Sequence, residues 1–244
     1  MNGEPMKEII SNFVRVSFCL IVSALAAGSV KADQAQLPER VFAPMGFDSN
    51  DNAEVVLYGH FPDTCYQAGP APFEIRGREI RIHNVVLHSD SGSCMKTPVP
   101  WATTVNLGAL SPGTYSVILE EMDGSTRYFV DLLIARSLTR RIDDYPYAYV
   151  NGAILNRTSR GVTLSVSGTF SVTCMEIAEM RVKETNGVIV ILPIVRLRKD
   201  IPCGHPFVPI PFIERLVLHP KTNAPALVHI RSMNGQALNQ VLDF

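Results

Sequence analysis

The sequence predicts an all-β protein of two tandem β-sandwich domains that arose by internal duplication and follow a signal peptide. Three observations support this prediction. The motif Gly-x-Phe-x-x-Thr-Cys occurs at residues 59–65 and again, 109 residues later, at 168–174. In each copy one further cysteine, Cys94 or Cys203, follows the motif cysteine by 29 residues. Short runs with apolar residues at every second position surround both motifs, as in strands with one buried face.

Residues 1–32 have the layout of a secretory signal peptide. Lys7 and Arg15 precede the apolar stretch 16–27, and small residues follow it up to Ala32. A membrane-spanning helix needs about 20 apolar residues, so this stretch is short for the alternative, a retained membrane anchor. We therefore expect an exported protein, periplasmic or secreted, with no integral membrane span in the mature chain.

The composition limits the kind of partner. The chain has 22 Lys and Arg against 23 Asp and Glu. Residues 1–32 contain three of these basic and two of these acidic residues, so 19 basic and 21 acidic residues remain after cleavage. This balance provides no basic surface for nucleic acid. We expect an unidentified protein or glycan partner of the cell envelope or extracellular space.

The alternation divides the mature chain into four segments. Residues 33–50 are polar and are interpreted as a leader, 51–136 as the first sandwich, 137–153 as a linker and 154–244 as the second sandwich. The two sandwiches are each long enough to bury a core.

Corresponding strands occur at matching positions of the two predicted sandwiches. The alternating run 53–57 corresponds to 162–166, and Ile80 and Ile82 correspond to Ile189 and Ile191. Residues 188–192 are almost wholly apolar, which indicates a strand covered on both faces. After the second cysteine of each unit the offset becomes 111 residues.

Near its end, each predicted sandwich has one Gly-containing turn. Residues 122–124 (Met-Asp-Gly) and 233–235 (Met-Asn-Gly) predict hairpins, because both central residues of a type I′ turn need positive φ. A last strand follows each turn, at 128–134 and 238–244.

The predicted linker contains three tyrosines, Tyr145, Tyr147 and Tyr149. Two interpretations remain open. The tyrosines pack the two domains together, or the segment is an exposed connection with incidental aromatic residues.

The run Leu-Gly-Ala-Leu-Ser-Pro-Gly-Thr-Tyr-Ser-Val at 107–117 resembles the strand entry of secreted immunoglobulin-like modules, in which a tyrosine sits at a corner of the sandwich. Both units are similar to bacterial exported immunoglobulin-like domains of the form Gly-x-Phe/Leu-Pro-x-x-Cys, then Cys, then Pro-aromatic. The resemblance implies two immunoglobulin-like sandwiches. The second unit departs from it, with Ser171 in place of Pro62 and Ala226 in place of Tyr115. Such a module specifies no activity.

The four mature cysteines are expected to form two disulfides within the units, because a duplicated unit that folds alone inherits its own bridge. The pairs are Cys65–Cys94 and Cys174–Cys203. Closing a loop of this length stabilises a domain by roughly 3–4 kcal/mol. Export favours oxidation. A zinc site is the alternative, but the chain has no Cys-x-x-Cys pair.

No catalytic motif is visible. The chain has neither Gly-x-Ser-x-Gly nor a histidine pair with metal-binding spacing. We therefore expect a non-enzymatic binding or structural protein, without cofactor or metal, that acts through loops, strand edges or the groove between domains. The alternative is a hydrolase or hydrolase inhibitor with its site at the domain junction. It predicts that the candidate histidines line one cleft: His60, His83, His88 and His205.

Overall fold

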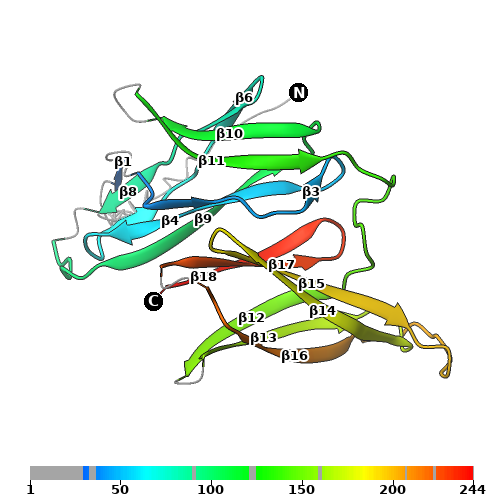
Figure 1. Ribbon diagram of the computed structural model, residues 1–244. Coiled ribbons are helices and arrows are strands. Elements are labelled where there is room, and N and C mark those ends of the chain that lie inside the picture. Colours follow the sequence, from blue (N-terminus) through cyan, green and yellow to red (C-terminus); the bar gives the residue numbers. More distant parts are fainter. Residues whose placement is uncertain are drawn as a thin grey trace, which may run out of the picture.

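The computed structural model of the chain describes residues 30–32, 37–89, 92–120, 125–158, 161–206, 208–221 and 224–243, with the backbone alone at 30–32 and 158. All regular elements in these ranges are β-strands, which confirms the predicted all-β class (Figure 1). Among these residues none belongs to a helix of the length and hydrophobicity that a membrane span requires. Residues 1–29 of the predicted signal peptide lie outside the described residues.

Residues 37–135, here called the first half, form two main sheets and, together with residues 30–32, a small third one. One main sheet has the order β2 (Arg40–Phe42), β4 (Ala53–Phe61), β9 (Val99–Gly108). The other has the order β3 (Phe47–Asp48), β11 (Thr126–Ala135), β10 (Gly113–Glu120), β7 (Glu79–Ile82), β6 (Phe73–Arg76). The small sheet consists of β1 (Val30–Ala32), β8 (Val86–Ser89) and β5 (Tyr66–Ala68).

Residues 149–243, here called the second half, form two sheets, and residues 136–148 connect the halves. The first sheet has the order β12 (Tyr149–Thr158), β13 (Gly161–Phe170), β16 (Ile210–Leu218). The second has the order β14 (Met175–Thr185), β15 (Val188–Leu197), β17 (Ala226–Ser232), β18 (Gln236–Leu242). Two strands, β2 and β3, fall within the predicted leader 33–50, and β12 begins within the predicted linker 137–153.

The strand pairings repeat between the halves. In the sheets β2-β4-β9 and β12-β13-β16 the central strands are β4 and β13, with antiparallel neighbours on both sides. In the larger sheets β7 runs parallel to β10, with Glu79 opposite Ser116, and β15 runs parallel to β17, with Val188 opposite Leu227. These positions differ by the same 109 and 111 residues as the sequence motifs. The parallel pairs distinguish both halves from immunoglobulin sandwiches, whose sheets are antiparallel.

The alternating apolar residues form one core in each half. In the first half Leu57 of β4 belongs to the same buried cluster as Leu119 of β10. In the second half Leu164 of β13 belongs to a second cluster with Ile191 and Val228. Each core therefore lies between a three-stranded sheet and a larger one, as expected for residues that point to one face at every second position.

The repeated motif has a packing role. A Cβ at Gly59 would lie 3.2 Å from the ring of Trp101, and a Cβ at Gly168 would lie 2.7 Å from the ring of Phe212. The phenylalanine of each motif stacks on that ring, at centroid distances of 5.3 and 4.7 Å. At Gly168 this ring and the backbone oxygen of Tyr149, 2.0 Å away, leave no room for a side chain, whereas at Gly59 the ring leaves a Cβ a tight fit.

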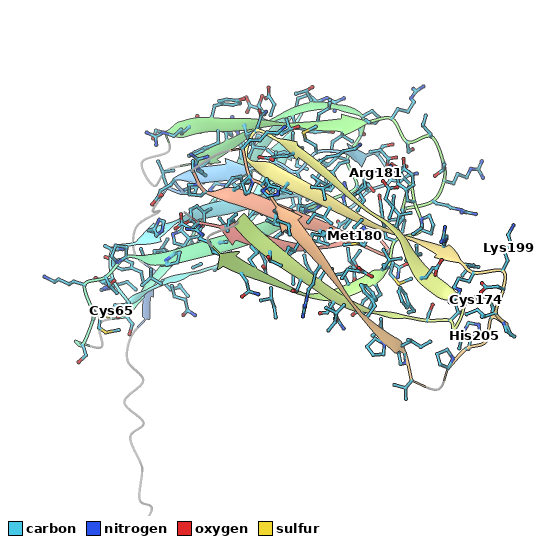
Figure 2. The ribbon with its side chains drawn as sticks, turned by 60° about the horizontal axis from the view of Figure 1, so that its bottom comes forward. Cys65, Cys174, Met180, Arg181, Lys199 and His205 are labelled. Carbon is cyan, nitrogen blue, oxygen red and sulfur yellow. A yellow bond between two sulfur atoms is a disulfide. The ribbon has the colours of Figure 1, made fainter. Side chains whose placement is uncertain are left out.

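The threonine and cysteine of each motif fasten a loop. The backbone N–H of Met95 donates to the Thr64 hydroxyl at 3.0 Å, and the N–H of Gly204 donates to the Thr173 hydroxyl at 2.9 Å. The two predicted disulfides are confirmed: Cys65–Cys94 and Cys174–Cys203. The disulfides lie at opposite ends of the molecule, where Figure 2 labels Cys65 and Cys174.

Tyr115 makes the hydrogen bond expected of a corner tyrosine. Its hydroxyl donates to the carbonyl oxygen of Ser111 at 3.0 Å. The guanidinium of Arg78 lies over its ring, 4.7 Å from the centroid. The corresponding position in the second half is Ala226, so this corner occurs in the first half alone among the described residues.

One predicted turn is confirmed and another was missed. Asn234 and Gly235 have φ values of 62° and 67°, as a type I′ hairpin requires. Asn186 and Gly187, at 51° and 75°, form a second turn of this kind between β14 and β15. The predicted turn at 122–124 lies outside the described residues.

The four main sheets stack in layers, and β2-β4-β9 and β12-β13-β16 do not occupy equivalent places in the stack (Figure 1). The outer face of β2-β4-β9 packs on the outer face of β14-β15-β17-β18. A third buried cluster fills this junction, with Val56 and Tyr58 on one side and Val188, Val190 and Leu227 on the other. The strand 188–192 is thus covered on both faces, as predicted.

Candidate functional site

A buried polar network crosses the junction of the two halves. Glu54 of β4 and His229 of β17 are 4% and 0% exposed. His229 Nδ1 lies 3.2 Å from Glu54 Oε1 and 2.9 Å from Asn239 Oδ1, and the Asn239 amide donates to Glu54. Burial alone would raise the pKa of Glu54, but the hydrogen bonds of His229 and Asn239 and the electrostatic attraction of His229 and Arg231 outweigh it and lower the pKa. The carboxylate is thus held ionised inside the junction.

Arg231 of β17 is the second buried charge of the junction. Its guanidinium lies over the Phe47 ring, 4.2 Å from the centroid, and its NH1 is 3.3 Å from Asp51 Oδ1. Burial raises the pKa of Asp51 against the attraction of this arginine. The first half therefore supplies both an aromatic ring and a carboxyl group to a cation of the second half.

At the rim of the junction, the imidazole of His60 of β4 lies between two carboxylates. Its Nδ1 lies 3.1 Å from Glu39 Oε1 and its Nε2 lies 3.1 Å from Asp243 Oδ2. Burial works against the charged form, but the two carboxylates raise the pKa of His60 above its usual value.

An open groove of about 620 Å³ lies beside this network, and we call it the junction groove. Both halves contribute to its lining: Asn52, Glu54, Asn106, Tyr149, Val150, Asn151, Ser232, Gln236, Ala237 and Leu238. Its volume falls in the range of about 300–1,000 Å³ that is usual for ligand sites. Four side-chain amides in the lining each offer a donor and an acceptor.

The four histidines of the hydrolase alternative do not line one cleft. His60 lies at the junction, and His83 lies 3.6 Å from Glu120 at one end of β7. His88 packs on Tyr66 with ring centroids 4.6 Å apart. His205 is exposed at the end of the molecule that carries Cys174 (Figure 2).

One group of candidate metal ligands was not foreseen from sequence spacing. One ligand atom each of Glu74, His83 and Glu120 lies within 4.8 Å of the others. All three are half-exposed, and Arg76 already binds Glu74 at 2.8 Å. Their common face follows from the alternation of β7, which continues to His83, the next residue, and places it on the same side as Glu79. The sequence contains that signal, but not the pairing that brings three strands together.

The polar residues of the junction were also missed. Glu54 and His229 each sit in an outward position of an apolar strand, where an isolated charge ordinarily faces water. The sequence did contain a sign of their burial: both residues lie in strands whose other residues are apolar on both faces, 53–58 and 226–230. A charge in such a strand needs a buried partner.

Comparison with protein families, with curated proteins and with solved structures finds no match to this chain. The function of this protein must therefore be inferred from the geometry of its own fold and junction.

Proposed function

We propose that the protein is an exported, non-enzymatic binding protein of the cell envelope or extracellular space, built from two disulfide-containing β-sandwiches that arose by duplication. The two disulfides support export, since disulfides persist in oxidising compartments. The repeated strand order and the repeated roles of the Gly-x-Phe-x-x-Thr-Cys motif support duplication.

The observation that carries the binding role is the junction groove. Asn52 and Asn106 come from the first half, and Tyr149, Asn151 and Gln236 come from the second. The groove therefore exists only while the halves are packed, and the buried Glu54–His229 contact holds them so.

The lining favours a glycan as ligand. A sugar hydroxyl both donates and accepts a hydrogen bond, and a side-chain amide does the same. Tyr149 is 40% exposed and offers an apolar ring beside these amides. The lining holds one carboxylate, Glu54, which is already engaged by His229 and Asn239. A neutral, hydroxyl-rich ligand matches this surface better than an ion does.

A glycan array followed by calorimetric titration of the best binder tests the proposal. We expect Asn52→Ala and Gln236→Ala each to weaken binding by about three- to tenfold, the loss of one or two hydrogen bonds. The matched control is Asn156→Ala, an exposed asparagine of β12 outside the groove. The proposal fails if no glycan binds, or if the groove variants bind as the wild type does.

A further inference from the structure

A second, smaller cavity lies at the junction, and we call it the tyrosine pocket. Its volume is about 180 Å³, the space of roughly six water molecules. It is lined by residues of the connecting segment, of the turn before β3 and of β14, β15 and β17: Met45, Gly46, Asp144, Tyr145, Tyr147, Lys183, Val188, Val190, Leu192 and Arg231. None of these residues lines the junction groove.

The strongest evidence for a ligand in this pocket is an arginine whose hydrogen-bond donors are only partly satisfied. Arg231 is 6% exposed, and its Nε is buried without a hydrogen-bond partner among the described residues. Its ion pair with Asp51, at 3.3 Å, engages one side of the guanidinium. Guanidinium carries five N–H donors, and leaving a buried donor unpaired costs free energy. A ligand with an acceptor oxygen would remove that cost.

A second cation stands at the pocket. Lys183 of β14 is exposed and makes no ion pair with any described residue. A lysine and an arginine that line one small cavity favour an oxyanion, and guanidinium binds a carboxylate with two parallel hydrogen bonds.

The walls are apolar and aromatic. Val188, Val190 and Leu192 form one wall, and Tyr147 is buried against them. Arg181 lies over the Tyr145 ring, 5.0 Å from its centroid, and orients that side chain. These walls fit an apolar body of a few carbon atoms rather than a free inorganic anion.

The carboxyl groups near the pocket repel a bound anion less strongly than the same number of fully ionised carboxylates would. Burial raises the pKa of Asp51, and burial together with Asp48 raises the pKa of Asp144. The titratable and charged groups around the pocket are Asp48, Asp51, Asp143, Asp144, Tyr145, Tyr147, Arg181, Lys183 and Arg231. Lowering the pH protonates Asp51 and Asp144 before ordinary carboxyls, which removes negative charge beside Arg231.

We propose that the tyrosine pocket binds a small organic carboxylate with an apolar body, the carboxylate on Arg231 and Lys183 and the body between Tyr147 and Val190. This site is independent of the glycan proposed for the junction groove.

Titration of the full chain with three probes of one shape tests the proposal: phenylacetate, its neutral amide phenylacetamide, and the cation phenethylamine. We expect phenylacetate to bind with one-to-one stoichiometry and phenylacetamide to bind at least about tenfold more weakly. Lowering the pH from 7 to 5.5 should tighten phenylacetate binding. The proposal is overturned if none of the probes binds, if the amide binds equally well, or if phenethylamine binds best.

Variants locate the site. Lys183→Gln should weaken phenylacetate binding by roughly two- to fivefold, as for an exposed ion pair, and should fold normally because Lys183 is at the surface. Lys199→Gln is the matched control, at the far end of the molecule beside Cys174 (Figure 2). Equal affinity of the two variants for phenylacetate would place its site elsewhere and refute the assignment.

Discussion

The sheets β2-β4-β9 and β12-β13-β16 have the same strand order, yet the first has its outer face buried at the junction while the second has its outer face open. The residues that face outward from the central strands explain the difference. Val56 and Tyr58 of β4 are 1% and 2% exposed, and the corresponding residues of β13 are Ser165 and Ser167. Inward-facing residues keep their apolar character in both strands, so only the outward set has diverged.

The larger sheets show the same divergence in the opposite half. Val188, Val190 and Leu192 of the second half are buried at the junction. The residues 109 positions earlier are Glu79, Arg81 and His83, which face outward at the end of the stack. One apolar face of each half is thus matched to the other half, and the charged face terminates the stack.

The position of a sheet in the stack is thus encoded at a few outward positions, while the fold of each half is encoded at the inward ones. Exchanging outward residues between corresponding strands should therefore change the junction and leave the halves intact.

The largest expected effect comes from Val56→Ser, which places the β13 residue at the junction. We expect a loss of about 2–4 kcal/mol in unfolding free energy, because the variant removes buried methyl groups and buries a hydroxyl. Urea denaturation gives the value. The reciprocal variant, Ser165→Val, lies on the open face and should change stability by less than about 0.5 kcal/mol. Equal losses of stability in the two variants would show that the outward positions of β4 and β13 do not differ in burial as described.

A smaller effect separates the two copies of the motif glycine. At Gly168 a Cβ would lie 2.0 Å from the backbone oxygen of Tyr149 and 2.7 Å from Phe212, so Gly168→Ala requires the strand β12 to move. At Gly59 the nearest atoms belong to the Trp101 side chain, at 3.2 Å. We expect about 1–3 kcal/mol of destabilisation for Gly168→Ala and less for Gly59→Ala. Thermal denaturation of both variants distinguishes them, and the reverse order would contradict the packing described for the motif.

The smallest effect concerns the rim of the junction. Because Glu39 and Asp243 raise the pKa of His60 when the protein is folded, its contribution to stability is complete below pH 6.5 and is lost as the pH rises through the raised value. All three groups are partly exposed, so the contribution is at most about 1 kcal/mol. Melting temperatures of the wild type and His60→Gln should converge above that pH. A constant difference between them would refute the ionic role, and His88→Gln serves as the control.

Much of each half could be predicted from the sequence because the signals are local. Cys65 and Cys94 are 29 residues apart, as are Cys174 and Cys203, and each pair forms the disulfide that this repeated spacing predicts. Residues 188–192 are apolar on both sides, and both sides are covered. Asn234 and Gly235 adopt the positive φ values that their turn needs.

The arrangement of the halves could not be predicted in this way. The sequence indicated that 188–192 is covered on both faces, but not that Tyr58 and Val56 cover the second face, since that contact joins residues 130 or more positions apart. The parallel pairing of β7 with β10 was missed for the same reason, because periodicity identifies a strand without identifying its neighbour. The junction network depends on that arrangement and was missed with it.

Because the junction buries residues of both halves, we expect the two halves to unfold as one cooperative unit. Trp101 is the single tryptophan of the chain and lies in the core of the first half. Its fluorescence therefore reports the first half, whereas far-ultraviolet circular dichroism reports the strands of both. Urea unfolding of the wild type followed by the two signals should give coincident transitions. Two separate midpoints would show that the halves unfold independently and would contradict their coupling through the junction.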